Sequence, residues 1–370
     1  MKIGIITFHR AVNYGAVLQS YALCKSVRSL GYECEIIDYR SQFIEDYYDL
    51  KHLLLPKNWK RLISYIISNG NLSPNKERFT SFLRDNHVLS KEIYNTHSDL
   101  LECEEIYDLF ITGSDQVWNY ATAGFDKAYF LDFVTDSDKK RSYAASFGFS
   151  EIPGEYINTY RELLKDFTMF SVRENAGEVI IRGFSNTPVT VDLDPTLLLN
   201  QDSWRSLASL PNDFPISSPK RFVLVYMIGE DIRILNLAKE LAKKQKMDVI
   251  YITDRWCNRR GVVNARRVTP SEWLGLFDKA DYIITNSFHG TAFSVNFEKR
   301  FVVLGNNQGK KKASRIETIL TDLGLQERLT YDQNDAMAVV CKSINYNSIK
   351  THLQDRRNNS LQNLSKELSH

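Results

Sequence analysis

Apolar positions in the first forty residues form two short runs, at 3–7 and 33–39, separated by a segment with helical spacing at 16–30. Short apolar runs of this length are typical of buried strands, and Gly31 is suited to ending the intervening helix. Two parallel strands joined through a helix need a right-handed crossover. The segment therefore predicts the beginning of a doubly wound α/β sheet.

The same alternation returns twice along the chain and predicts two domains. Further short strands are expected at 106–112, 142–147, 169–172 and 189–191. A second series consists of strands at 222–228, 248–253, 282–284 and 301–304, with helices at 232–245, 271–279 and 314–324. We expect an α/β fold of two Rossmann-like, doubly wound domains at 1–200 and 201–346.

Three segments fall outside this alternation. The loop after Trp204, rich in Pro and Ser, is the best candidate linker, and Ser271 is the expected N-cap of helix 271–279. The polar tail 347–370 is expected to be helical and could pack back on the first domain. A helical insertion around 51–85 combines basic and aromatic residues. It fits either a helix that covers the core or one that lies on an anionic membrane surface.

Composition narrows the class of protein. Hydrophobic residues make up 43% of the chain, as in a folded globular protein, and 47 basic residues nearly balance 45 acidic ones. A formal net charge of +2 gives no global field for binding nucleic acid. Five widely spaced cysteines without a CxxC pair indicate neither a zinc site nor a disulfide framework. We expect a cytoplasmic protein, with contact to the inner face of the cell membrane as a further option.

The most distinctive polar loop follows the strand at 282–284. Asn286, Ser287, His289, Gly290 and Thr291 are small or polar, and they lead into the start of a helix. Ligands of open α/β sheets bind at the carboxyl ends of strands, and a helix start offers free N–H groups to an anion. His289 is therefore a candidate proton donor or acceptor beside an anion site. The alternative is a structural histidine, with Gly290 serving the turn.

Two loops of the first domain carry polar groups at the same kind of position. Asn13 and Tyr14 are expected to face the cleft, and Gly15 lets the chain turn into the helix. In the second loop, Asp115 and Trp118 could bind a sugar through carboxylate and ring face. Alternatively, Asp115 is an N-cap and Trp118 belongs to the core. No GxGxxG or P-loop motif occurs in the chain.

Two arginines are candidate anion ligands. Arg173 ends a predicted strand, where its planar fork suits a carboxylate or phosphate, although an ion pair with Glu174 or another acid is the alternative. Arg315, at a helix start, could meet an anion held near His289. The Asp-x-Asp pairs at 192–194 and 136–138 are too short a pattern to indicate a metal, and we assign none.

Seven motifs occur together in a recognisable order. They are Asn-Tyr-Gly-Ala (13–16), Gly-Ser-Asp-Gln-Val-Trp-Asn (113–119), Ser-Tyr-Ala-Ala-Ser-Phe-Gly (142–148), Ser-Val-Arg-Glu (171–174), Asp-Pro-Thr-Leu-Leu-Leu (194–199), Ser-Phe-His-Gly-Thr-Ala-Phe (287–293) and Ser-Arg-Ile (314–316). Through this ordered set the chain resembles the polysaccharide pyruvyl transferase family over most of its length. The insertion and the tail lie outside the resemblance.

The resemblance implies a fold similar to the B-type glycosyltransferases, in which two Rossmann-like domains face a cleft, here with 1–200 on the acceptor side and 201–346 on the donor side. It also implies a ketal-forming transferase. Such an enzyme moves a pyruvyl group from phosphoenolpyruvate to two hydroxyls of a sugar and releases phosphate. The sugar belongs to a bacterial capsule, exopolysaccharide or cell-wall glycan, commonly while lipid-linked. No cofactor is implied beyond phosphoenolpyruvate as the co-substrate.

The resemblance also implies roles for single residues. Arg173 and His289 fall on the family's anion-binding arginine and histidine, and Arg315 is a softer match. We expect His289 to be the acid or the phosphate-orienting donor and Asp115 the acceptor-side base. The expected substrate-binding residues are Asn13, Tyr14, Gly15, Gly113, Ser114, Trp118, Asn286, Ser287, Gly290, Thr291 and Arg315. Competing hypotheses are a nucleotide-sugar-dependent glycosyltransferase of the same fold and a non-catalytic glycan-binding homologue. The acceptor sugar, the bridged hydroxyl pair and the oligomeric state stay open.

Overall fold

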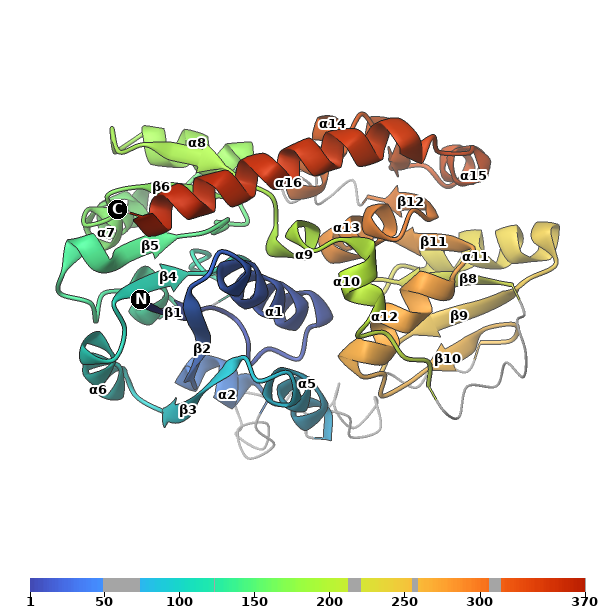
Figure 1. Cartoon of the computed structure of the whole chain (residues 1–370). Coiled ribbons are helices and arrows are strands. Elements are labelled where there is room, and N and C mark those ends of the chain that lie inside the picture. Colours follow the sequence, from blue (N-terminus) through green and yellow to red (C-terminus); the bar gives the residue numbers. More distant parts are fainter. Residues whose placement is uncertain (49–73, 123, 212–220, 255–258, 306–313, 370) are drawn as a thin grey trace. The chain divides into compact units, whose positions relative to one another are not determined.

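The computed structural model of the chain describes residues 1–48, 74–122, 124–211, 221–254, 259–305 and 314–369. Apart from the undescribed positions, the chain divides into two compact units (Figure 1). Unit 1 comprises Met1–His52, Phe79–Leu199 and Gln354–His370, and unit 2 comprises Leu53–Arg78 and Asn200–Leu353.

Unit 1 is built on a five-stranded parallel sheet of strand order β3-β2-β1-β4-β5. Its strands are β1 (Lys2–Ile6), β2 (Glu33–Tyr39), β3 (Leu89–Tyr94), β4 (Leu109–Thr112) and β5 (Lys140–Ser142), followed by a smaller parallel pair, β6 (Phe170–Val172) and β7 (Val189–Val191). Its helices are α1 (Tyr14–Ser29), α2 (Gln42–Tyr48), α5 (Pro74–Asp85, which begins in unit 2), α6 (His97–Leu100), α7 (Ile157–Leu164), α8 (Asn175–Arg182) and α9 (Pro195–Leu198).

The apolar runs of unit 1 form strands because both faces of the sheet are covered. Ile3, Ile5 and Ile6 of β1 are fully buried, as a parallel sheet between helical layers requires. Isolated parallel bridges join Asp115 to Ala145 and Ala145 to Val172. The segment after β5 therefore lies between the segment after β4 and the end of β6. The loops that follow β4 and β6 are thereby brought together.

Unit 2 has a six-stranded parallel sheet of order β10-β9-β8-β11-β12-β13. Its strands are β8 (Phe222–Tyr226), β9 (Asp248–Ile252), β10 (Val263–Ala265), β11 (Tyr282–Thr285), β12 (Arg300–Leu304) and β13 (Leu329–Thr330). Its helices are α10 (Gln201–Arg205), α11 (Ile232–Gln245), α12 (Pro270–Lys279), α13 (Phe288–Asn296), α14 (Ser314–Asp322) and α15 (Gln333–Cys341). The last helix, α16 (Tyr346–Ser369), begins in unit 2 and ends in unit 1.

Two local expectations differ from the structure. The N-cap of α12 is Thr269 rather than Ser271, because Thr269 and Glu272 form a capping box around Pro270. The boundary between the units falls between Leu199 and Asn200, so Trp204 already belongs to unit 2. The Pro- and Ser-rich loop follows that boundary and lies mostly outside the described residues, as does most of the helical insertion around 51–85.

The second half of α16 packs on unit 1, where it lies along β5 and β6 (Figure 1). The backbone N–H of Leu193 donates to Ser360 Oγ at 3.0 Å, and Asn363 Nδ2 donates to Asp192 Oδ1 at 2.9 Å. Arg141 Nε donates to the carbonyl of Glu367 at 2.8 Å. These contacts attach the helix to unit 1, and in one of them Asp192 is the acceptor.

Among the helices that the structure describes, none has the length and apolar content needed to cross a membrane.

Candidate active site

Both sheets have a topological switch point, where the strand order reverses direction. In unit 1 it lies between β1 and β4, and in unit 2 between β8 and β11. The connections leaving two such strands go to opposite faces of the sheet, which opens a crevice at their carboxyl ends where ligands bind. The loops predicted to carry chemistry in the two units follow β1, β4 and β11.

The unit 2 loop is a compact helix start built from hydroxyl groups. Ser287 is the N-cap of α13, and its Oγ accepts from the backbone N–H of Gly290 at 3.3 Å. Thr285 Oγ1 accepts from the N–H of Ser287 at 3.0 Å, and Thr291 Oγ1 donates to the carbonyl of Ser287 at 2.9 Å. The hydroxyls of Ser287 and Thr291, both predicted to bind substrate, are buried and engaged in forming this turn.

His289 is the one ionisable residue between β11 and the end of α13. It occupies the first turn of α13, is 7% exposed, and its ring meets Phe288 edge to face at 5.1 Å. Gly290 allows α13 to approach β11, because a Cβ there would collide with Thr285 Oγ1. The helix start thus holds the histidine beside backbone N–H groups, which favour anions.

Asn286 ties the two loops of the switch point together. Its Oδ1 accepts from the N–H of Ile228 at 2.7 Å, and its Nδ2 donates to the carbonyl of the same residue at 3.1 Å. Both ends of its amide therefore bind the chain that follows β8, which gives Asn286 a positioning function. Arg315 lies in the first turn of α14 and is half-buried, and residues 306–313 before it are not described.

The first loop of unit 1 is arranged differently from the expectation. Asn13 is the N-cap of α1, with its Oδ1 accepting from the N–H of Ala16 at 3.3 Å. Tyr14 is buried, and its ring lies 4.9 Å from that of Phe79. Gly15 is buried in the first helical turn. These three residues form the start of α1. Asn13 and Tyr14 were predicted to point into a cleft, but their described contacts are with the first turn of the helix and with Phe79.

The loop after β4 places Asp115 at the edge of the sheet. Gly113 packs on Thr7, and Ser114 is fully buried, its carbonyl accepting from Thr7 Oγ1 at 2.9 Å. Asp115 takes a left-handed backbone conformation with φ of 75°. Its Oδ1 accepts from the N–H of Gln116 at 2.9 Å, and the alternative that it caps a helix is wrong, because no helix follows it.

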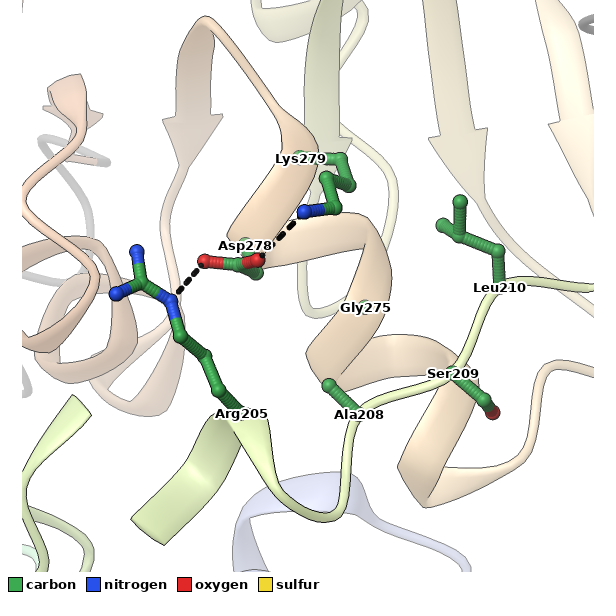
Figure 2. A pocket seen from close by; sticks show the side chains of 7 residues that line it. All are labelled: Arg205, Ala208, Ser209, Leu210, Gly275, Asp278 and Lys279. Carbon is green, nitrogen blue, oxygen red and sulfur yellow. Dashed lines mark hydrogen bonds and ion pairs between the residues drawn. The ribbon is translucent and has the colours of Figure 1, made fainter. Parts of the chain in front are cut away.

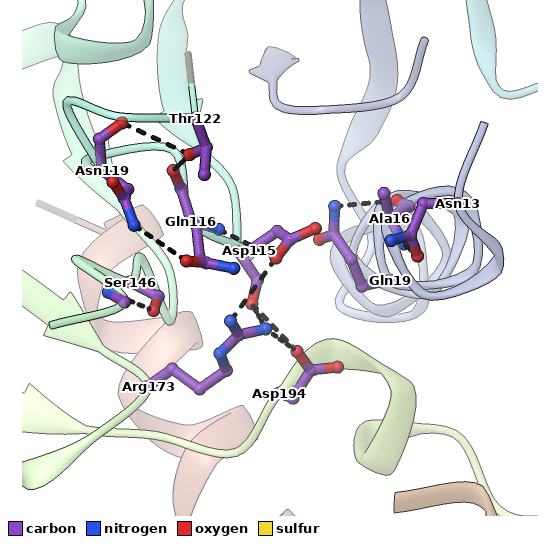
Figure 3. Close-up of polar contacts among 12 residues, drawn as sticks. Asn13, Ala16, Gln19, Asp115, Gln116, Asn119, Thr122, Ser146, Arg173 and Asp194 are labelled. Atoms are coloured by element: carbon purple, nitrogen blue, oxygen red, sulfur yellow. Dashed lines mark hydrogen bonds and ion pairs between the residues drawn. The ribbon is translucent and has the colours of Figure 1, made fainter. Parts of the chain in front are cut away.

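Arg173 lies among three carboxylates, of which Figure 3 shows Asp115 and Asp194. Its Nη1 donates to Asp194 Oδ2 at 2.7 Å, its Nη2 lies 3.5 Å from Asp115 Oδ1, and its Nε lies 3.9 Å from Glu174 Oε2. The Arg173 side chain is 1% exposed. Burial would lower the pKa of Arg173, but the charges of Asp194, Asp115 and Glu174 outweigh burial and raise it.

This environment does not suit the predicted role of Arg173 as an anion ligand. Among its described contacts the guanidinium is bound by three carboxylates, and its side chain is 1% exposed, which leaves little of it accessible to phosphoenolpyruvate. The ion-pair alternative describes the observed contacts. Arg173 instead orients Asp115, whose side chain is 12% exposed, the most accessible of the three carboxylates. Asp115 Oδ2 makes no hydrogen bond within the described parts of the chain, and it can accept a proton.

Trp118 is a core residue. It is fully buried, its Nε1 donates to the carbonyl of Tyr129 at 3.2 Å, and its ring packs on Phe130, Phe147, Phe167 and Phe170. The ring has no free face for a sugar, so its expected role in substrate binding is corrected to the core alternative. An aromatic side chain after a strand cannot be assigned to site or core from spacing alone.

Asp194 and Glu174 hold Asp115 and Arg173 in place, and of these two only Glu174 was considered as a partner of Arg173 from the sequence. Asp194 caps α9 with Oδ1, which accepts from Thr196, and holds Arg173 and Ser114 with Oδ2. Glu174 Oε1 accepts from Ser146 Oγ at 2.9 Å and from the N–H of Phe147 at 3.1 Å. The Asp-Pro-Thr sequence was a usable signal, since it matches a helix N-cap with proline at N1.

In the described residues no three His, Cys, Asp or Glu side chains form a group that could hold a metal ion. Of the Asp-x-Asp pairs, Asp192 and Asp194 bind unit 1 side chains and Asp136 caps a short helical turn.

The sequence of residues 13–308 matches the family model described as polysaccharide pyruvyl transferase. The chain belongs to that family, which is a family of enzymes. The match includes the loops that carry Asp115, Arg173 and His289, and the predicted family is confirmed. No curated protein sequence matches the chain significantly.

Solved structures share the fold of this pyruvyl transferase family member at low sequence identity. The UDP-GlcNAc 2-epimerase from Neisseria meningitidis bound to UDP-GlcNAc matches with a TM-score of 0.55 and 11% identity, over 100% of this chain and 99% of that one. A putative UDP-N-acetylglucosamine 2-epimerase from Listeria monocytogenes matches with a TM-score of 0.52 and 9% identity, over 98% and 90%. The glycosyltransferase SnogD from Streptomyces nogalater matches with a TM-score of 0.46 and 12% identity, over 99% of both chains. The predicted fold class, with two parallel α/β sheets, is confirmed.

Proposed function

We propose that the enzyme transfers a pyruvyl group from phosphoenolpyruvate to two hydroxyls of a sugar in a bacterial surface polysaccharide precursor. The products are a cyclic pyruvate ketal and free phosphate. The observation that carries the proposal is family membership over 13–308, a range that includes the loops that carry Asp115, Arg173 and His289. The donor and the acceptor sugar are the parts that the experiments below test.

The unit 2 loop supports a role in binding the donor. Phosphoenolpyruvate carries a phosphate and a carboxylate, and both are favoured at a helix N-terminus. The start of α13 provides such an end, with His289 in its first turn. This helix start is buried and capped by a hydroxyl, so its backbone N–H groups are already in place before the ligand arrives. Less entropy is therefore lost in ordering them on binding.

The reaction removes one proton from each of two hydroxyls, delivers one proton to the methylene carbon and releases the other with the phosphate. Protonation of the methylene carbon of phosphoenolpyruvate makes the adjacent carbon electrophilic, and the first sugar hydroxyl adds there and loses its proton. The carbon–oxygen bond to phosphate then breaks, and the second hydroxyl adds and loses its proton to close the ketal. His289 is assigned as the acid or the phosphate-orienting donor, and Asp115 as the acceptor-side base.

Asp115 suits the role of base because of its neighbours. Arg173 and the N–H of Gln116 hold one of its oxygens, which fixes the direction of the other. Arg173 is accordingly assigned as a positioning residue. Asp115→Asn should lower kcat for phosphate release and leave the KM for phosphoenolpyruvate nearly unchanged, whereas a purely structural role would lower the free energy of unfolding as well.

The first experiment is phosphate release from phosphoenolpyruvate with a panel of nitrophenyl and lipid-linked sugars. Release that depends on one sugar supports the proposal and names the acceptor. If no sugar of the panel gives phosphate release, and UDP but not phosphoenolpyruvate stabilises the protein thermally, the glycosyltransferase alternative would replace the proposal. Stabilisation by glycans without any turnover would favour a glycan-binding protein.

The acceptor is proposed to be lipid-linked, which would place the enzyme at the inner face of the cell membrane. Co-sedimentation of the full chain with vesicles containing a polyprenyl-diphosphate sugar tests this part separately. Equal sedimentation with and without the lipid-linked sugar would contradict it.

A further inference from the structure

A polar pocket lies in unit 2, away from the loop of His289 (Figure 2). It has a volume of about 380 Å³ and is lined by Arg205, Ala208, Ser209, Leu210, Gly275, Asp278 and Lys279. This volume falls within the usual range of small-molecule sites. All of the described residues that line it belong to unit 2.

The pocket lies at the opposite edge of the sheet from the candidate active site. Asp278 and Lys279 end α12 just before β11, and Lys299 comes directly before β12. These positions are at the amino ends of parallel strands, whereas His289 follows the carboxyl end of β11. A ligand in the pocket therefore does not share the donor loop.

Positive charge outweighs negative charge among the described residues that line the pocket. Arg205 Nε binds Asp278 Oδ1 at 2.9 Å, Lys279 Nζ binds Asp278 Oδ2 at 3.2 Å, and Lys299 Nζ donates to the carbonyl of Asp278. Among the residues that line the pocket, two cations thus face one carboxylate. Asp202 lies 3.7 Å from Arg205, and Lys299 lies near Asp281 as well as Asp278. Burial would raise the pKa of Asp278, but hydrogen bonds from Arg205 and Lys279 hold it below its ordinary value.

The two lining cations are open to solvent while the carboxylate is not. The side chains of Arg205 and Lys279 are 45% and 61% exposed, and that of Asp278 is 8% exposed. Figure 2 shows Asp278 between them, with the Arg205 guanidinium turned so that its Nη groups lie beyond the ion pair. An entering ligand would meet the cations before it met the carboxylate. A guanidinium with free N–H groups and a nearby ammonium suit a phosphate group.

The walls of the pocket are held by packing. Trp204, beside Arg205, is fully buried with its ring 5.1 Å from Phe293, and Trp273 and Phe277 of α12 are stacked at 3.9 Å. The N–H of Ser209 donates to the carbonyl of Ser271 at 3.0 Å, and a Cβ on Gly275 would collide with Ser209. The loop 206–210 therefore sits closely on α12, and the pocket exists before any ligand binds.

We infer that this pocket, formed by α10, α12 and the loop between Arg205 and Leu210, binds the phosphate group of a small molecule or lipid headgroup. The site goes beyond the proposed transfer reaction, and it does not depend on it. When no ligand is present, the Asp278 carboxylate is ion-paired with Arg205 and Lys279, so it competes with an incoming phosphate for these two cations.

The test is titration of the full chain with inorganic pyrophosphate, followed by calorimetry. Lys279→Glu should weaken binding by about tenfold or more, because a charge-assisted contact is lost and repulsion is added. Asp278→Asn should strengthen binding several-fold, because the competing carboxylate becomes neutral. A group of surface ion pairs without a ligand would show no such gain.

The matched control is Lys244→Glu. Lys244 is 56% exposed and pairs with Glu240 at 2.8 Å on α11, so it resembles Lys279 in exposure and pairing without lining the pocket. Equal pyrophosphate affinity in Lys279→Glu and Lys244→Glu would overturn the inference. So would a wild-type protein that binds no pyrophosphate, or binding that is lost in His289→Gln but kept in Lys279→Glu, since that result would assign the phosphate to the donor loop.

A second arm distinguishes the source of the phosphate. Co-sedimentation with phosphatidylglycerol vesicles that is lost in Lys279→Glu supports a lipid headgroup. Pyrophosphate binding without co-sedimentation supports a soluble ligand. Urea unfolding of each variant verifies that the fold is retained.

Discussion

The switch-point loops of the two units are built in the same way, but the charges of the side chains around them differ. In each unit a buried parallel strand leads to a capped helix, and the cap distance is 3.3 Å in both, from Asn13 in unit 1 and Ser287 in unit 2. Unit 1 adds one arginine and three carboxylates, which bind each other. Unit 2 adds hydroxyls, an amide and a single histidine.

The difference indicates which ligand each unit suits. A formally negative cluster with one accessible carboxylate can accept protons from sugar hydroxyls but disfavours an anionic donor. A neutral helix start attracts anions and offers one group that can handle a proton. Under the proposed function, the same fold would supply a general base in unit 1 and an anion site in unit 2.

The largest expected effect concerns the unit 2 loop. His289→Gln should lower kcat for phosphate release by about 10²–10⁴-fold, the usual contribution of a general acid. Steady-state kinetics with saturating phosphoenolpyruvate measures it. His352→Gln is the control, because His352 is an exposed histidine of the same unit. Unchanged turnover in His289→Gln would leave the histidine with a structural role.

The next effect concerns the charged cluster of unit 1. Arg173→Ala should lower the free energy of unfolding by about 3–5 kcal/mol, because it leaves buried carboxylates without their partner. Urea denaturation measures the change. Arg182→Ala removes an exposed pair with Glu178 and should cost less than about 1 kcal/mol. Equal costs for the two variants would show that the buried cluster is not a special feature of unit 1.

A smaller effect is expected from the close approach of α13 to β11. Gly290→Ala should destabilise the enzyme by about 1–3 kcal/mol, because the added methyl group collides with Thr285. Gly154→Ala is the control, since a Cβ there meets nothing within 4 Å. Thermal unfolding of both variants should separate them, and similar melting temperatures would contradict the packing argument.

The smallest effect compares the two caps directly. Ser287→Ala and Asn13→Ala should each cost about 1 kcal/mol, because each removes the acceptor for one N–H of the first helical turn. Urea denaturation of the two variants tests whether the caps are equivalent. A cost confined to one of them would mean that the other helix start is fixed by packing rather than by its cap.

Local patterns in the sequence determined most of the secondary structure. The expected helix 232–245 has the bounds of α11 (Ile232–Gln245), and the expected strand 33–39 those of β2 (Glu33–Tyr39). Both are long enough for their periodicity to be unambiguous. The strands that were not predicted are short or lie at sheet edges, such as β13 (Leu329–Thr330) and β3 (Leu89–Tyr94). Their few alternating residues give little periodic signal.

The sequence by itself therefore determined the fold class, the family and the loops on which chemistry is expected, because these depend on residues that are near one another in the chain. Only the tertiary structure decided what Arg173 and Trp118 contact. Described partners of Arg173 come from residues 115, 174 and 194, and those of Trp118 from residues 129–170. Whether a polar or aromatic side chain meets a ligand or its own core depends on which distant segments fold around it, and spacing along the chain does not contain that information.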